Sequence, residues 1–288
     1  MPWRAAVFGA SGQLAVELVR ELERRKHSVT SWSREELDIT DAAKVERAIA
    51  RSEAEVVFNA AAYNQVDVAE QEPLAALQVN GIAVRNLALA CRQTDARLVH
   101  FSTDYVFDGF AKRPYTEEDP PHPLGAYAVS KLTGELFARA YLEKALVVRT
   151  SGVFGPGGLT TARGNFVELM LRLAAGNKPI RVVEDHFASP TYAPLLAART
   201  IDILELGESG LFHCGGGTAI SWFDFARKIF SVAGLEPKLI PTNAREYRTA
   251  AIRPKYSALA NARLESLGLP AMPTIDEVLE MYFIARSH

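Results

Sequence analysis

The feature that most constrains the fold is a regular alternation of short apolar runs with longer amphipathic runs through residues 1–151. The short apolar runs are rich in valine, as in buried strands. The longer runs between them carry apolar residues at helical spacing. Such strand–helix alternation indicates a parallel sheet covered by helices on both faces, and right-handed crossovers then give a doubly wound, Rossmann-type α/β sheet. Strands are predicted at 3–8, 28–32, 55–62, 97–102 and 145–151, and helices at 13–25, 41–52, 73–93 and 127–142.

The second half of the chain changes character after Ser151, where a Gly- and Thr-rich stretch predicts a loop. Helices are predicted over 166–176, 195–207, 221–234 and 275–286, with a strand at 180–185. We expect a dinucleotide-binding domain over 1–151, joined by about 180–206. A small C-terminal α/β substrate lobe would comprise about 152–179 and 207–288, and the cleft between the two is the expected ligand site.

Composition limits the classes of partner. The net charge of −2 and the absence of a basic stripe argue against nucleic acid and anionic membranes. No apolar run approaches ~20 residues, so no membrane span is expected. The first strand begins by Trp3, which leaves no room for a signal peptide, and Cys91 and Cys214 are too few for a disulfide framework. We therefore expect a cytoplasmic protein with buried thiols.

The turn FGASGQLA joins the first predicted strand to the first predicted helix. Gly9 permits a tight turn, and Gly12 lets a pyrophosphate approach the amides at the start of the helix. Ala15 takes the third position, where a small residue lets helix and strand pack closely. In this context the turn predicts a dinucleotide site.

The end of the second strand indicates which dinucleotide is bound. An NAD site usually places an acid there, whereas this strand is followed by Ser33 and Arg34. A hydroxyl and a guanidinium suit a ribose phosphate, because guanidinium pairs with phosphate through two hydrogen bonds. NADPH is therefore the expected cofactor, with NADH as the alternative.

Reductive chemistry is indicated by a tyrosine and a lysine on one helical face. Tyr127 and Lys131 lie four residues apart, downstream of the hydroxyl-bearing strand end STDYVFDG. An ammonium near a phenol favours the phenolate, and the lysine could also hold the cofactor ribose. The Thr103 hydroxyl could hold a substrate oxygen while the tyrosine protonates it.

These residues belong to a longer set of motifs. FGASGQLA, LDITD, NAAAYNQVD, STDYVFDG, YAVSK, DHFASPTYA and AIRPKYSAL occur in this order and cover most of the chain. The set resembles the extended short-chain dehydrogenase/reductase superfamily and, within it, the dTDP-4-dehydrorhamnose reductase family. The resemblance implies reduction of a 4-keto sugar on a nucleoside diphosphate in dTDP-rhamnose biosynthesis.

The resemblance also implies roles for individual residues. Tyr127 matches the proton donor, Lys131 its partner and Thr103 the catalytic hydroxyl, while Asn80 matches a helix asparagine that supports the proton relay. The expected cofactor-binding residues are Gly9, Ser11, Gly12, Gln13, Leu14, Ser33, Arg34, Asp38, Ile39, Ala60, Ala61, Ala62, Tyr63, Asn80, Tyr127 and Lys131. The expected substrate-binding residues are Thr103, Asp104, Tyr105, Gly152, Asn165, Phe166 and Arg253.

Two departures from the family pattern bear on specificity. Gly152 stands where a tryptophan against the sugar is expected, so that a stacking wall would be missing. Pro194 stands where some relatives carry an acid linked to an interfacial metal, so no metal is expected. Two alternatives therefore stay open: another sugar-nucleotide reductase, epimerase or dehydratase, or a non-catalytic NADP-binding subunit like the regulatory beta-subunit of methionine adenosyltransferase.

Several smaller features are interpreted as structural. His100 is expected to be a packed strand residue, and Asp67 and Glu70 a solvated helix face. Asp104 suits either a turn-stabilising carboxylate or an acceptor in the pocket. The aromatic residues of 222–225 are expected in the core of the small lobe. Homodimers are common in this superfamily, although nothing in the sequence fixes an interface.

Overall fold

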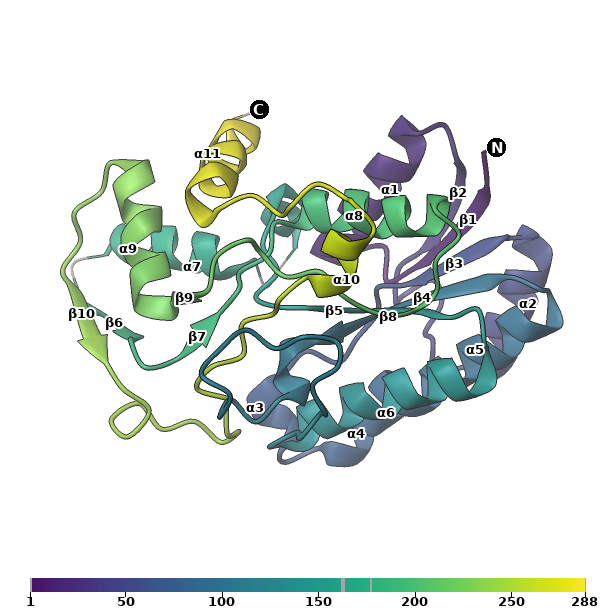
Figure 1. The fold of residues 1–288 in the computed structure, drawn as a ribbon, viewed down its shortest axis with the longest axis horizontal. Helices are drawn as coiled ribbons and strands as arrows, with labels where there is room; N and C mark the ends of the chain where they lie inside the picture. The colour runs from purple at the N-terminus through teal and green to yellow at the C-terminus, as the bar shows by residue number, and fades with distance from the viewer. Residues whose placement is uncertain (1, 162–163, 177, 288) are drawn as a thin grey trace.

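A six-stranded parallel sheet forms the centre of the computed structural model, which describes residues 2–161, 164–176 and 178–287 (Figure 1). The strand order is β2-β1-β3-β4-β5-β8, so the chain reverses its direction of travel between β1 and β3. At such a switch point the loops diverge and leave a crevice at the carboxyl ends of the strands. The strands are Arg4–Phe8 (β1), Ser28–Trp32 (β2), Val56–Asn59 (β3), Arg97–Thr103 (β4), Leu146–Thr150 (β5) and Gly210–His213 (β8).

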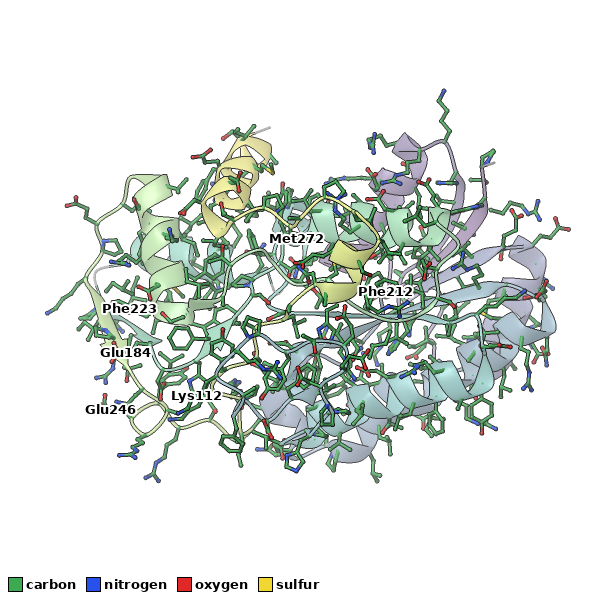
Figure 2. The ribbon with its side chains drawn as sticks, in the orientation of Figure 1. Lys112, Glu184, Phe212, Phe223, Glu246 and Met272 are labelled. Carbon is green, nitrogen blue, oxygen red and sulfur yellow. The ribbon has the colours of Figure 1, made fainter. Side chains whose placement is uncertain are left out.

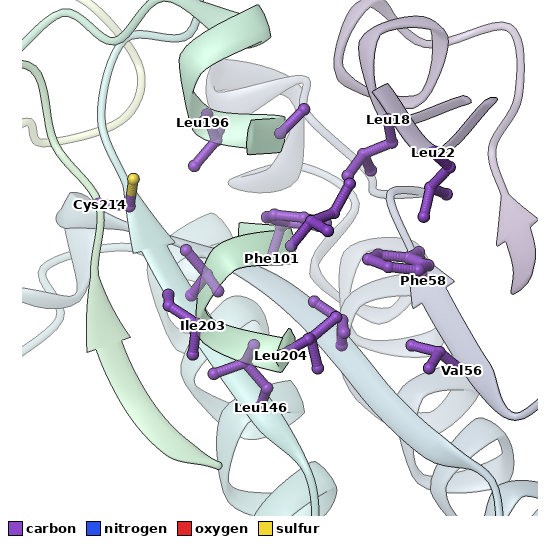
Figure 3. Close-up of a cluster of buried hydrophobic side chains, with 14 of the residues drawn as sticks. Leu18, Leu22, Val56, Phe58, Phe101, Leu146, Leu196, Ile203, Leu204 and Cys214 are labelled. Atoms are coloured by element: carbon purple, nitrogen blue, oxygen red, sulfur yellow. The ribbon is translucent and has the colours of Figure 1, made fainter. Parts of the chain in front are cut away.

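Helices cover both faces of this sheet, as the sequence predicts. Helices α1 (Gln13–Arg24) and α8 (Ala193–Glu205) pack together on one face, whereas α2 (Ala42–Ser52), α5 (Ala83–Gln93) and α6 (Ala126–Tyr141) cover the other. Each face has its own hydrophobic cluster because the strands are buried on both sides. Figure 3 shows the first cluster, in which side chains of α1 and α8 meet those of β3, β4 and β5.

The predicted helix 73–93 is interrupted. It consists of α4 (Pro73–Leu77), a π-helical turn over Gln78–Ile82 and α5, and the short α3 (Val66–Ala69) precedes it. Within the described residues, Pro73–Gln93 is one stretch long and apolar enough to cross a membrane by length and composition alone, where the sequence analysis expected none. Half of its most apolar window is buried inside the fold, and a core helix passes the same test.

The C-terminal elements form a second, smaller body beside the sheet (Figure 1). Its cluster of buried side chains lies among α7 (Phe166–Ala174), α9 (Trp222–Ala233) and α11 (Ile275–Arg286), with Phe225 at its centre. Two small sheets complete it: β6 (Ile180–Val183) pairs in parallel with β10 (Leu239–Thr242), and β7 (Phe187–Ala188) pairs antiparallel with β9 (Ile220–Ser221).

Short segments connect the two bodies. Strand β8 joins the main sheet, and α10 (Ala262–Ser266) packs against it. Figure 2 labels Phe212 in β8 of the main sheet, Met272 beside that sheet, and Phe223, Glu184 and Glu246 in the smaller body. Since Met272 belongs to the first cluster of the sheet, the chain returns across the sheet before it enters α11.

Candidate functional site

A cavity of about 410 Å³ opens beside the switch point, at the carboxyl ends of the central strands. It brings together the three predicted catalytic residues, which come from the end of β4 and the start of α6. The predicted site residues that line this smaller cavity are Gly12, Gln13, Leu14, Ala60, Ala61, Ala62, Thr103, Asp104, Tyr127, Lys131, Gly152 and Asn165.

The glycine turn shapes one end of the smaller cavity. Gly9 has a φ of +84°, and a Cβ there would lie 2.7 Å from the Ala61 nitrogen, so only glycine fits. Gly12 caps α1 in an extended conformation without any side-chain cap, which leaves the first amides of the helix for a ligand. Ala15 is fully buried beneath the sheet. Ser11 is exposed and stands, like Gly9, outside the cavity lining.

Three residues of the smaller cavity carry buried polar atoms that lack a hydrogen-bond partner within the described residues. They are Gln13 Oε1, Asn59 Oδ1 and Thr150 Oγ1. The side-chain nitrogen of Gln13 donates to the Val153 carbonyl (2.8 Å), whereas the side-chain oxygen of Gln13 has no hydrogen-bond donor. Because an unpaired buried polar atom is costly, these atoms fit a cavity that a polar ligand fills.

The residues after β2 lie outside the cavity lining, beside the glycine turn. Ser33 and Arg34 are only partly covered or exposed, and the Arg34 side chain is 79% exposed with Nε 3.4 Å from Asp38 Oδ2. The other Asp38 oxygen accepts from the Thr40 amide and hydroxyl. These hydrogen bonds, together with the nearby Arg34, lower the pKa of Asp38. Ile39 is buried in the second cluster of the sheet. Since its side chain is exposed and its contact with Asp38 is long, the Arg34 guanidinium is accessible to a ribose phosphate.

Thr103 and Asp104 end β4 in a hydroxyl–carboxylate network. Thr103 Oγ1 donates to Asp104 Oδ1 (3.1 Å) and accepts from the Tyr105 amide (3.2 Å). The other Asp104 oxygen accepts from the hydroxyls of Ser151 (2.8 Å) and Ser257. Burial raises the pKa of Asp104 to about 6, although the hydroxyl donors oppose that shift. These contacts are all made to hydroxyls of the protein itself, and Asp104 also lines the cavity, so they do not choose between the turn-stabilising carboxylate and the acceptor in the pocket.

Tyr127 and Lys131 lie one turn apart in α6, at the wall facing Thr103. The Tyr127 ring meets the Tyr105 ring edge-on, with centroids 6.0 Å apart. Lys131 Nζ donates to the Phe101 carbonyl (2.5 Å), which fixes the ammonium below the end of β4. Burial lowers the pKa of Lys131 to about 8, and the Glu135 carboxylate opposes this.

A buried ion pair beneath the site was not predicted. Glu135 accepts both guanidinium hydrogen bonds of Arg149 (2.9 and 2.7 Å) and a third from the Ser102 hydroxyl (2.5 Å). Both side chains are almost fully buried. The arginine inside the valine-rich run of β5, and the acid one turn after Lys131, were the available sequence signals. The pair ties α6 to β4 and β5, which carry the site.

Asn80 lies behind the cavity and does not line it. Its side-chain oxygen accepts from the Tyr63 amide (2.8 Å), and its nitrogen donates to the Tyr63 carbonyl (3.0 Å) and the Ser130 hydroxyl (3.0 Å). Ser130 in turn donates to the Tyr127 carbonyl (2.7 Å). Asn80 and Tyr63 therefore support the segment after β3 and the first turn of α6.

A larger cavity of about 620 Å³ lies between the end of β4 and the C-terminal body. Aromatic and aliphatic side chains and four cations line it, a combination suited to a flat base linked to an anionic group. Tyr105, Phe166 and Arg253 are the predicted substrate residues in its lining. The cations are Arg181, Arg248, Arg253 and Lys255.

Gly152 lines the smaller cavity and lies beside Trp222, which lines the larger one. It has a φ of +49°, and a Cβ there would lie 3.1 Å from the edge of the Trp222 indole. Trp222 also packs edge-on against Phe166, with centroids 4.7 Å apart. A wall from α9 therefore borders the position where the sequence analysis expected open space. Asn165 caps α7 through the Glu168 amide (3.0 Å).

Glu70 is exposed and the Asp67 side chain is 44% exposed, so both acids reach solvent as predicted, but each also binds a distant part of the chain. Asp67 accepts two hydrogen bonds from Arg253 (3.0 and 2.7 Å) and one from the Ala251 amide. Glu70 accepts from the Ala126 amide (2.8 Å) and so caps α6 from a different helix. The sequence could not identify these acids, because their partners lie far away along the chain.

The part of the chain that the structure describes offers no set of side chains for a metal ion. No group of three or more His, Cys, Asp or Glu side chains there could hold an ion.

Comparison with known proteins gives one consistent family. The family model described as RmlD substrate binding domain matches residues 4–285. A dTDP-4-dehydrorhamnose reductase of Streptomyces griseus is 39% identical over 276 residues, covering 92% of this chain and 88% of its own length. The spore coat polysaccharide biosynthesis protein SpsK of Bacillus subtilis is 36% identical, covering 92% of both chains. A crystal structure of dTDP-4-dehydrorhamnose reductase from Bacillus anthracis in complex with NADP is 36% identical, with a TM-score of 0.94 over 99% of both chains.

Proposed function

Because the chain belongs to the RmlD substrate binding domain family, we propose that it is an NADPH-dependent oxidoreductase that reduces the 4-keto group of a nucleotide-activated deoxysugar. The observation that carries this proposal is the convergence of Thr103, Tyr127 and Lys131 on one cavity beside the glycine turn. The reductase name of the Streptomyces griseus relative supports the reaction.

The residues around the smaller cavity fit a nicotinamide dinucleotide. The uncapped amides after Gly12 suit its pyrophosphate, and the unpartnered oxygens of Gln13, Asn59 and Thr150 offer acceptors or, for Thr150, a donor. The NADP bound to the Bacillus anthracis structure supports this cofactor. When bound, it would supply the hydride for the carbonyl carbon.

The protein residues would then handle the oxygen and its proton. Tyr127 donates a proton to the oxygen as hydride reaches the carbon, and the ammonium of Lys131 stabilises the resulting phenolate. Thr103 makes a second contact to the same oxygen. Asn80 acts behind them by holding the first turn of α6 through Ser130.

The nucleotide half of the substrate would occupy the larger cavity. Phe166 and Trp222 offer aromatic faces, and Arg253 is one of four cations for the diphosphate. The sugar would lie near Tyr105 and Gly152, where the two cavities meet. The domain division of the sequence analysis, with the cofactor on the sheet and the nucleotide sugar on the C-terminal lobe, stays part of this proposal.

Replacement of Tyr127 tests the reaction. Tyr127→Phe removes the proton donor and keeps the ring, so kcat for NADPH oxidation with dTDP-4-keto-6-deoxyhexose should fall by about 10²–10⁴-fold. The NADPH dissociation constant should change little, because the ring still fills its place. Tight NADPH binding by the wild type without turnover of any keto sugar would instead support a regulatory subunit.

Arg34 tests the choice of cofactor. Arg34→Ala should weaken NADPH binding by about tenfold and leave NADH binding nearly unchanged, since only NADPH carries the ribose phosphate. Binding of both cofactors would be measured by fluorescence titration, with Arg20→Ala, an exposed arginine of α1, as the matched control. Equal losses for both cofactors would contradict the phosphate role.

We also propose a cytoplasmic setting, in keeping with the two free, buried cysteines. The homodimer that is common in the superfamily would be tested by sedimentation equilibrium. The chain mass of 31.5 kDa, or twice that value, gives the two outcomes.

A further inference from the structure

We propose that Asp104 is a positioning residue that fixes the Thr103 hydroxyl and ties the C-terminal segment 250–259 to the hydride-transfer cavity. The proposal rests on the proposed function. Asp104 follows Thr103 directly and is only 3% exposed, yet it lines the smaller cavity. Asp104 therefore borders the reaction site while being almost closed to solvent.

The partners of this carboxylate are hydroxyl groups from three separate parts of the chain. Thr103 ends β4, Ser151 follows β5, and Ser257 comes from the C-terminal segment. Among the described residues, no lysine or arginine forms an ion pair with Asp104. A buried carboxylate without a cation depends on such donors, so the three segments are held together at one point.

The Thr103 hydroxyl is directed by Asp104. It has one proton, which it donates to Asp104, while the Tyr105 amide donates to its oxygen. While the Thr103 hydroxyl donates to Asp104, only a lone pair of its oxygen is available to a ligand. Thr103 can donate to a ligand only if its hydroxyl turns away from Asp104. In either case the orientation of the hydroxyl at the reacting oxygen depends on this carboxylate.

The second Asp104 oxygen links the larger cavity to the same point. Segment 250–259 contributes Arg253 and Ser257 to the lining of the larger cavity. The segment is held at one end by Asp67, through Arg253 and the Ala251 amide. Near its other end, the Ser257 hydroxyl donates to Asp104 and the Ser257 amide donates to the Phe187 carbonyl (2.8 Å). A nucleotide that contacts this segment therefore acts on the residue that orients Thr103.

Two variants separate the two contacts. Asp104→Asn keeps the shape but turns one of the two acceptor oxygens into an amide donor, which breaks part of the hydroxyl network. The kcat should therefore fall by about tenfold while the NADPH dissociation constant changes by less than about twofold. Ser257→Ala cuts only the tie to the segment, so the dissociation constant for dTDP, measured by calorimetry, should rise by about fivefold. Ser151→Ala is the matched control, because it removes a hydroxyl from the same oxygen without touching the segment. Its dTDP affinity should stay at the wild-type value.

The outcomes distinguish this role from a structural one. Thermal unfolding of each variant reports any loss of folding, and kcat is taken per folded enzyme. An Asp104→Asn enzyme with wild-type kcat, or equal dTDP affinities for Ser257→Ala and Ser151→Ala, would overturn the proposal. If the wild type reduces no keto sugar, the proposed function fails instead, and dTDP binding by the Ser257 and Ser151 variants still decides whether the tie exists.

Discussion

At the scale of single residues, the site depends on charged groups that are held away from water. Lys131 is nearly inaccessible to solvent. Its ammonium donates a hydrogen bond to the Phe101 carbonyl and is attracted by the Glu135 carboxylate. Burial disfavours the charged form and brings the pKa of Lys131 down to about 8, within reach of working pH. In the proposed mechanism, the charge that would assist Tyr127 is therefore one that an alkaline buffer removes.

The pH profile follows from that pKa. Lys131 is protonated below about pH 8 and neutral above it, so kcat/KM for the keto sugar should fall as the pH rises through about 8. The ratio kcat/KM for the keto sugar reports the groups of the enzyme before the sugar binds. Lys131→Arg stays charged across this range and should remove the alkaline fall, even if its rate is lower. A wild-type profile that is flat to pH 9 would contradict the role of the ammonium.

At the scale of elements, α6 is held by contacts from outside itself. Glu70 caps its first turn, Asn80 bonds to Ser130, and Arg149 pairs with Glu135. Gly134 faces the π-helical turn, and a Cβ there would collide with the Asn80 carbonyl oxygen and lie 2.9 Å from His100 Nε2. The close approach of α6 to this turn explains why a glycine sits in the interior of the helix.

Gly134→Ala tests that packing. Alanine is normally better than glycine inside a helix by about 1 kcal/mol, but here the collision with backbone should reverse the sign. We expect the free energy of unfolding to fall by about 2 kcal/mol, and kcat to fall with it because Asn80 and Tyr127 lose their relative placement. Denaturant unfolding measures the first and NADPH oxidation the second. Gly176→Ala, whose Cβ would come no closer than 3.4 Å to the Leu173 carbonyl oxygen, serves as the control. Equal stability of the two variants would contradict the argument.

The same helix marks the limit of sequence-based prediction. The alternating pattern predicted α6 and its two site residues, because apolar spacing and the Tyr127–Lys131 interval are local. The cap by Glu70 and the pairing of Glu135 with Arg149 could not be predicted, since each depends on a partner placed by the tertiary fold. The π-helical turn was hidden for a similar reason: Gln78–Ile82 has an ordinary helical pattern. Strand β8 has only four residues, too short to signal that it would join the main sheet.

At the scale of the whole molecule, the net charge and the charge of the larger cavity predict opposite effects on the binding of an anion. A chain of net charge −2 should not attract a nucleoside diphosphate, which is itself an anion. The larger cavity nevertheless gathers four cations. Three of them have acidic partners, namely Glu246 for Arg181, Asp67 for Arg253 and Asp185 for Lys255. These acids offset part of the cationic charge, so the field at the ligand depends on the charges in and around the cavity, within about a Debye length, rather than on the net charge of the chain.

The salt concentration should consequently affect the affinity for the diphosphate and not the affinity for the nucleoside. Between about 10 mM and 150 mM salt the Debye length shrinks from about 30 Å to about 8 Å, so dTDP affinity should fall by about tenfold while that of uncharged thymidine stays constant. Calorimetry at both salt concentrations measures this. Arg248→Ala should reduce the salt dependence, whereas Arg245→Ala, an exposed arginine of the same segment outside the cavity lining, should leave it intact. If thymidine and dTDP respond alike to salt, the cations do not bind the diphosphate and the base alone would account for the affinity.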